Sequence, residues 1–372
     1  MEEMSVGTLV ATAGFGLGII FGAVANKTNF CTMGGVSDVV LMGNGTRFRA
    51  WMLAISVAIL GTQGLHMLGV IDLTLPASEN GPIYLTTNFG WPGAILGGLL
   101  FGFGMTRGGG CGNRTLVRIG TGNLKSLVVF MIMGITAYMT LRGIIALGRI
   151  QLETLNVDLT AYGLQSQSMI EMVGMVIGVE TENLRLIFTL IVGLAIAGYC
   201  FKSPDFRTSP SNIFAGIVIG LLIPAGWYVT GYLGADDFEP VQMFSFTFVS
   251  PSAASIQYLM TFTGATINFG IATVGGVILG SFLVAIATRS FHIEAFGGVD
   301  DLKGSMSGAT MMGIGGVIAL GCTIGQGLSG MSTLALSSLI ALTSIIIGAV
   351  WGIKSMEEGS TMGGLKAMLA RG

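Results

Sequence analysis

The sequence predicts an all-α polytopic integral membrane protein, and three observations carry this prediction. Apolar residues make up 52% of the 372-residue chain and charged residues only 10%, against roughly 25% charged residues in soluble domains. The mean hydropathy is +0.79. Apolar runs long enough to cross a hydrocarbon core of about 30 Å as helices recur along the chain. Together these observations argue against a soluble globular domain.

Long runs with few or no charged residues are predicted to be membrane-spanning helices. They cover residues 5–25, 50–71, 126–141, 186–201, 212–233, 265–288 and 331–353. Two shorter glycine-rich runs, 92–106 and 305–322, end at glycine–cysteine sequences, where glycine disfavours a continuing helix. We expect these two runs to be interrupted within the membrane. The prediction is therefore about nine transmembrane helices plus short non-spanning half-helices.

The first run is expected to be a retained membrane helix and not a cleaved signal peptide. The residues before it include two glutamates and no basic cluster. Gly14, Gly18 and Gly22 recur at every fourth position within the run. This spacing lines one helix face with small residues and predicts close packing against a neighbouring helix.

The distribution of Lys and Arg predicts the orientation, because basic residues accumulate in cytoplasmic loops. Residues 72–90 and 234–264 contain neither and are placed outside the membrane. The first 26 residues also lack both, which places the N-terminus outside. Basic residues near the other end place the C-terminus in the cytoplasm. Residues 150–184 carry several carboxylates and are expected to form an extracytoplasmic connection with a helix lying on the membrane surface.

Glycine and cysteine positions predict two inverted pseudo-repeats within one transmembrane domain covering residues 1–372. One superposition places Gly93, Gly97, Gly102, Gly104, Gly110 and Cys111 on Gly304, Gly308, Gly313, Gly315, Gly321 and Cys322. A second match relates residues 34–38 to residues 297–301. Inverted repeats of this kind bring broken helices together near the membrane midplane. The expected boundaries are 5–148 for the first repeat, 149–185 for the connector and 186–353 for the second repeat.

Composition and motifs exclude several functional classes. The net charge is −2 and no basic stripe is present, so nucleic acid is not an expected partner. No P-loop sequence occurs, which argues against ATP-driven pumping by this chain. No Cys-x-x-Cys pair or Cys/His metal spacing occurs. We therefore expect no cofactor, no metal and no conventional catalytic residues.

Three of the four cysteines share a sequence context. Cys31, Cys111 and Cys322 stand at polar or glycine-rich breaks, whereas Cys200 ends an ordinary apolar run and is interpreted as a small buried hydrophobe. Glycine-broken helix ends expose backbone N–H groups and positive dipole ends, which suit an anion. A neutral thiol is a weak, polarizable donor that matches a soft sulfur-bearing anion. The predicted substrate-binding residues are Cys31, Cys111, Cys322, Gly110, Gly321 and the amide donors Asn113 and Gln326.

The cysteine motifs carry a family resemblance over nearly the whole chain. The segments are Lys27–Cys31 with Gly34-Gly35, Gly109–Cys111, Ala287–Phe291 and Gly321–Gly325. In this order they resemble the YeeE/YedE family of bacterial membrane proteins. The resemblance implies uptake of thiosulfate across the bacterial inner membrane, with the three motif cysteines passing the ion along an hourglass path by S–H contacts. It also implies an inverted-repeat fold and a small cytosolic sulfur-carrier protein as partner.

Other interpretations stay open at this point. The chain could be a membrane sulfurtransferase or thiol redox protein that forms a cysteine persulfide. It could also transport a selenium compound or a soft metal, although the 22 methionines are scattered. His66 is interpreted as a hydrogen-bonded histidine near the outer interface and not as a proton relay. Arg107, Arg114 and Arg118 could guide anions or simply follow the positive-inside bias.

Overall fold

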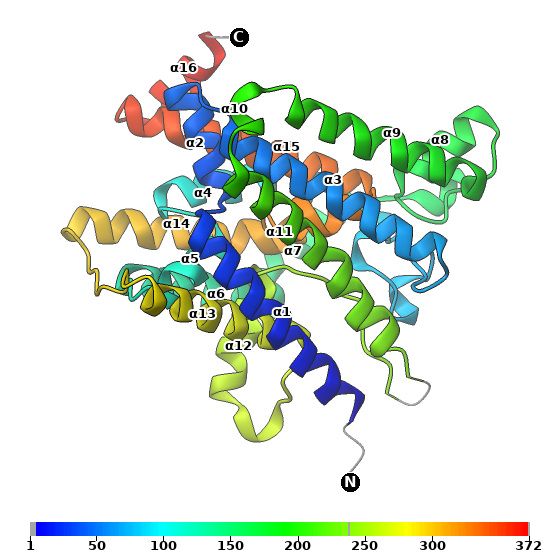
Figure 1. The fold of residues 1–372 in the computed structure, drawn as a ribbon, viewed down its shortest axis with the longest axis horizontal. Coiled ribbons are helices and arrows are strands. Elements are labelled where there is room, and N and C mark those ends of the chain that lie inside the picture. Colours follow the sequence, from blue (N-terminus) through cyan, green and yellow to red (C-terminus); the bar gives the residue numbers. More distant parts are fainter. Residues whose placement is uncertain (1–4, 237–238, 371–372) are drawn as a thin grey trace.

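The computed structural model describes residues 5–236 and 239–370, and nearly all of its regular structure is helical. Within the described residues the strands are β1 (Asn88–Phe89) and β2 (Val157–Asp158), which form one short antiparallel pair. Figure 1 shows long helices that cross one another, with the start of α1 at the bottom of the view and α16 at the top. The arrangement agrees with an all-α protein.

Seven helical segments in the described part of the chain are long and apolar enough to cross a membrane. They contain α1 (Val6–Thr28), α3 (Thr46–Met67), α6 (Leu124–Arg142), α9 (Thr181–Phe201), α11 (Pro210–Tyr228), α13 (Phe269–Ala287) and α15 (Leu336–Glu357). Each of them overlaps one of the seven long predicted runs. The prediction of a polytopic helical membrane protein is therefore confirmed.

The remaining elements connect these helices or pack between them. The α-helices are α2 (Thr32–Met42), α4 (Trp91–Arg107), α5 (Gly112–Gly120), α7 (Ala146–Glu153), α8 (Met169–Ile177), α10 (Pro204–Arg207), α12 (Val249–Met260), α14 (Val299–Ile318) and α16 (Thr361–Ala370). Short 3-10 helices are η1 (Ala77–Glu79), η2 (Ile83–Leu85), η3 (Leu159–Tyr162) and η5 (Phe262–Gly264). Two further segments, η4 (Val229–Leu233) and η6 (Gly325–Gly330), are π-helical. α14 begins several residues before the apolar run 305–322, because its first turn holds Asp300 and Asp301, whose carboxylates favour a helix N-terminus.

The glycines of α1 lie against α13. A Cβ atom placed on Gly22 would lie 2.1 Å from the carbonyl oxygen of Val277, and one on Gly18 would lie 2.7 Å from that of Thr273. From the other side, a Cβ atom on Gly280 would lie 2.0 Å from the oxygen of Ile19. Only glycine permits so close a backbone approach. The small-residue packing face predicted for the first helix is confirmed.

The two glycine-rich helices α4 and α14 cross each other in the interior. A Cβ atom on Gly97 would lie 2.7 Å from the oxygen of Gly315, and one on Gly104 would lie 2.8 Å from that of Gly308. α4 also packs on α15, and α14 packs on α6. Both helices end directly before a predicted substrate-binding cysteine, so this crossing sets where Cys111 and Cys322 lie.

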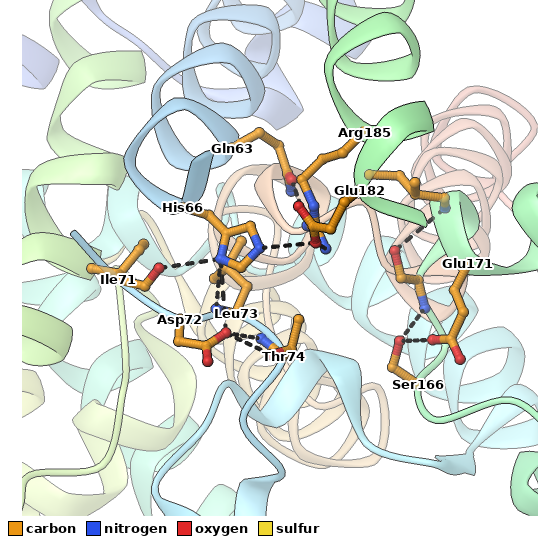
Figure 2. A network of polar contacts seen from close by, with 12 residues as sticks. Gln63, His66, Ile71, Asp72, Leu73, Thr74, Ser166, Glu171, Glu182 and Arg185 are labelled. Atoms are coloured by element: carbon orange, nitrogen blue, oxygen red, sulfur yellow. Dashed lines mark hydrogen bonds and ion pairs between the residues drawn. The ribbon is translucent and has the colours of Figure 1, made fainter. Parts of the chain in front are cut away.

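A polar network joins the C-terminal end of α3 to the start of α9 (Figure 2). The Leu73 amide donates to Nδ1 of His66 at 3.2 Å, and the His66 side chain is only 10% exposed. The hydrogen-bonded histidine predicted from the sequence is confirmed. Deeper in the same network, Arg185 donates to Oε1 of Gln63 at 3.1 Å, and Gln63 donates to the carbonyl oxygen of Ser332 at 3.0 Å.

Candidate substrate path

Cys31 and Cys111 form a buried thiol pair. Their sulfur atoms lie 3.8 Å apart although the residues are 80 positions apart in the sequence. Cys31 caps the N-terminus of α2, where its sulfur accepts a hydrogen bond from the Gly34 amide at 3.5 Å. Cys111 occupies the corresponding cap position of α5. Two helix N-termini therefore present thiols to the same point, and their dipoles favour a bound anion there.

The turn before Cys111 depends on two glycines. Gly109 has a φ of +75°, in the left-handed region that favours glycine. A Cβ atom on Gly110 would lie 3.0 Å from Cδ of Arg114. Because the predicted site residue Gly110 has no side chain, the Arg114 side chain can lie against the backbone directly before Cys111.

Asn113, one of the predicted site residues, lies beside the thiol pair. The Cys111 thiol donates to its Oδ1 at 2.7 Å. Its Nδ2 is buried and has no hydrogen-bond partner among the described residues. An unpaired buried amide group is costly unless something accepts its hydrogen bond. The side chain is therefore free to donate to a bound anion.

Cys322 is fully buried in the tight connection between α14 and η6. Its sulfur accepts from the Gly325 amide at 3.5 Å and lies 3.9 Å from the hydroxyl of Thr247. A Cβ atom on Gly321 would lie 3.0 Å from the backbone nitrogen of Gln326, so this position also requires a small residue.

Gln326 differs from its expected role as a free donor. Its Nε2 donates to the carbonyl oxygen of Ala319 at 2.5 Å, and its Oε1 accepts from Ser338 at 2.6 Å. Through these two hydrogen bonds, the Gln326 side chain stabilises the segment that carries Cys322. Its amide is therefore not free to bind a substrate.

Thr323 links the two cysteine-bearing connections. It follows Cys322 directly, and its side chain lies next to the Cys111 thiol. The Thr323 side chain is fully buried. The segments after α4 and α14 therefore meet, and the three predicted cysteines belong to one continuous group of polar side chains.

The three arginines near Cys111 have different environments. Arg118 donates to the carbonyl oxygen of Gly109 at 2.9 Å and so supports the glycine turn. Arg107 is exposed at the end of α4. The Arg114 side chain lies beside Gly110 and forms no salt bridge with a carboxylate among residues 5–236 and 239–370.

A cavity of about 290 Å³ opens against the connection that carries Cys322. Its lining includes Gln326, Ser337 and Gln167, together with Asn88 and Arg149. The Ser337 hydroxyl and the Gln167 Oε1 are buried and unpaired within the described residues. The sequence did not indicate this cavity, because its lining comes from five separate stretches of the chain.

Two further residues near Cys322 were not predicted. Thr247 lies in the stretch 234–264, which was expected to be an outer loop because it lacks Lys and Arg. The structure corrects this expectation in part, since residues 245–249 are buried. Tyr84, also buried, places its hydroxyl 3.3 Å from where a Cβ atom on Gly325 would be. The alternation of polar and aromatic residues over 244–248 is the signal that could have indicated a buried extended segment.

Cys200 lies apart from this group. It is fully buried against Phe206 and Ala50, and its thiol donates to the carbonyl oxygen of Arg49 at 3.3 Å. The interpretation of Cys200 as a small buried side chain is confirmed.

Comparison with known proteins agrees with the geometry. The chain is 29% identical over 347 residues to the thiosulfate transporter TsuA of Escherichia coli strain K12, covering 90% of this chain and 91% of that protein. It is 24% identical over 338 residues to the thiosulfate transporter TsuA of Spirochaeta thermophila, covering 89% and 94%. The sequence pattern of a family described as sulphur transport matches residues 27–351. Because this match covers most of the chain, the resemblance is confirmed, and the protein belongs to the sulphur transport (YeeE/YedE) family.

Proposed function

We propose that the protein is a permease that takes up thiosulfate, or a similar reduced-sulfur anion, into the cytosol. Two relatives are named thiosulfate transporters, which supports a sulfur anion as the substrate. The single observation that carries the proposal is the buried pair of Cys31 and Cys111 at 3.8 Å. Buried thiols at two helix N-termini combine soft donors with a favourable dipole and suit an anion that ends in sulfur.

The ion passes from Cys322 to Cys111 and then to Cys31. Thr323 bridges the first two, since it follows Cys322 and lies beside the Cys111 thiol. Asn113 adds its unpaired amide at the middle position. Thiols hold a dianion weakly, which conduction requires, because an ion must leave each position as readily as it arrives. Gly110 and Gly321 keep the backbone close to the path.

The basic residues define the direction of this path. The C-terminus and the basic loops face the cytoplasm of a bacterial cell, and the N-terminus faces outward across the inner membrane. Cys31 lies on the side of Arg47 and Arg114, which is then the cytosolic side. A small cytosolic sulfur-carrier protein receives the ion there. The acidic stretch with α8, whose Val176 is 86% exposed, lies at the outer membrane surface.

The structure has seven helical segments long and apolar enough to span a membrane, and the proposal adds α4 and α14 to them, which gives nine transmembrane helices. α4 follows the outer segment 72–90, and α14 follows the basic loop that contains Arg289. The two helices therefore enter the membrane from opposite sides, as inverted repeats require. Both end shortly before a buried cysteine. The whole chain acts as one transmembrane transporter domain.

A second candidate function is a membrane sulfurtransferase. The observation that favours it is again the Cys31–Cys111 pair, since a thiolate of one residue could attack the sulfane sulfur of thiosulfate. The sulfur–sulfur bond of thiosulfate would break, sulfite would leave with the bonding electrons, and the cysteine would carry a persulfide. This reaction adds about 32 Da to the protein, whereas a transport path leaves its mass unchanged.

Uptake of radiolabelled thiosulfate into proteoliposomes tests the proposal. The wild-type protein and Cys200→Ala are expected to transport thiosulfate, with little competition from sulfate. Cys111→Ala is expected to be inactive while remaining folded. Absence of transport by the wild type, or full transport by Cys111→Ala, contradicts the proposal. Mass spectrometry after substrate exposure separates the two candidates, because a persulfide adduct supports the sulfurtransferase.

A further inference from the structure

The helix contacts of the protein come in matching sets. α1 packs on α13, and α11 packs on α3. α4 packs on α15, and α14 packs on α6. α2 contacts α3, and α12 contacts α13. These contacts relate five helices of the first half to five of the second half, in chain order: α1, α2, α3, α4 and α6 correspond to α11, α12, α13, α14 and α15. Neither α5 nor α9 is part of this correspondence. The match of residues 34–38 with 297–301 does not follow this pattern, because the first lies in α2 and the second at the start of α14.

The same correspondence relates two buried pairs of side chains. In the first set, Cys31 at the start of α2 lies 3.8 Å from Cys111, which follows α4. In the second set, Thr247 lies directly before the cap of α12 and 3.9 Å from Cys322, which follows α14. Thr247 therefore faces Cys322 as Cys31 faces Cys111, although it lies one residue before the helix cap and Cys31 is the cap itself.

The packing of the neighbouring aromatic residues fixes the direction of the Thr247 side chain. Phe246 and Phe248 both pack on Phe21, with ring centroids at 5.4 and 5.2 Å. Successive side chains of an extended segment point to opposite sides. Thr247 is thus directed away from Phe21 and toward Cys322. The buried Thr247 hydroxyl has the Cys322 thiol as its hydrogen-bond partner. A thiol forms only weak hydrogen bonds.

We propose that Thr247 is a substrate-binding residue and forms, with Cys322, the outer binding position of the path. The inference rests on the proposed function and adds to it a residue outside the cysteine motifs. Thiosulfate has two chemically different ends, a terminal sulfur and a group of three oxygens. A thiol and a hydroxyl side by side offer a soft donor to the first and a hard donor to the second. Such a mixed pair favours thiosulfate over an anion that carries only oxygen.

Substitution of Thr247 tests this proposal. Thr247→Val keeps the shape and removes the hydroxyl, and it is expected to raise both the Kd and the uptake KM for thiosulfate about tenfold, as loss of a hydrogen bond to a charged group predicts. Thr247→Ser keeps the hydroxyl and is expected to bind and transport as the wild type does. Thr140→Val is the matched control, because Thr140 is equally buried and its hydroxyl bonds only within its own helix, to Thr136.

Calorimetric titration of the detergent-solubilised protein gives the Kd independently of transport. Wild-type affinity in Thr247→Val, measured on folded protein, overturns the proposal. If that variant does not fold, Thr247→Cys decides, because it replaces the hard hydroxyl donor by a second soft thiol, as in the pair of Cys31 and Cys111. It is expected to raise the uptake KM for thiosulfate, while sulfate competes no better than it does with the wild type. A wild-type KM, or stronger competition by sulfate, then overturns the proposal. A wild-type protein that transports no thiosulfate contradicts the proposed function instead.

Discussion

The Cys111 thiol lies between two partners, with its hydrogen directed to Oδ1 of Asn113 at 2.7 Å and its sulfur 3.8 Å from that of Cys31. The amide orients the thiol, and the sulfur remains exposed to the second cysteine. This arrangement leaves the amide nitrogen of Asn113 unpaired in the described structure. A bound anion would accept a hydrogen bond from that amide nitrogen.

Asn113 is expected to contribute to anion affinity. Asn113→Asp replaces an unpaired donor by a carboxylate, which repels an anion, so thiosulfate uptake should fall at least tenfold. Uptake into proteoliposomes measures the effect. Asn212→Asp is the control, because Asn212 lies elsewhere and bonds only to Ser209 nearby in the chain. Equal uptake by both variants would show that Asn113 does not face the ion.

Oxidation should close the path at the thiol pair. A mild oxidant is expected to join Cys31 and Cys111 in a disulfide and to stop uptake, and a reductant should restore it. Peptide mapping identifies the bond, and Cys200→Ser should behave as the wild type because Cys200 lies apart. Uptake that continues with the disulfide fully formed would place the ion path away from this pair.

The close contact of α1 and α13 should tolerate no side chain at Gly22. Gly22→Val would place atoms within 2.1 Å of the Val277 carbonyl oxygen. We expect a loss of about 1–3 kcal/mol or more in the free energy of unfolding. Gly16→Ala lies in the same helix, where a Cβ atom meets nothing within 4 Å, and serves as the control. Thermal unfolding in detergent compares the two variants. Equal Tm values for Gly22→Val and Gly16→Ala would contradict the close packing of α1 on α13.

The Arg185–Gln63 bond should hold α9 against the rest of the protein. Arg185→Met leaves Oε1 of Gln63 buried and unpaired, which is expected to cost about 1–3 kcal/mol. Arg207→Met, at an exposed position, is the control. The Tm in detergent should fall for the first variant only. A Tm unchanged by Arg185→Met would mean that apolar packing alone docks this helix.

The proposed orientation predicts which exposed positions a membrane-impermeant thiol reagent reaches. All four native cysteines are buried, so background labelling is expected to be low. Thr263→Cys, in the outer segment, should be labelled on intact spheroplasts. Ser360→Cys, before α16, should be labelled only after the membrane is opened. The reverse pattern would invert the topology and the direction of the path.

The sequence by itself determined the membrane class, the seven long helices and the packing face of α1. These features are local, because the length and polarity of a helix, and the spacing of Gly14, Gly18 and Gly22, are set by neighbouring residues. The glycine–cysteine motifs likewise indicate Cys111 and Cys322 as candidate site residues. The ordinary apolar run that Cys200 ends distinguishes it from them.

Only the tertiary structure decided which groups face one another. The 3.8 Å pairing of Cys31 with Cys111 depends on how α4 crosses the bundle, and the engagement of Gln326 depends on Ala319 and Ser338. Thr247 could not be identified from the chain, because a stretch without Lys or Arg is equally compatible with an outer loop and with a buried extended segment. Burial and contact are properties of helices that pack from distant stretches, and no local pattern encodes them.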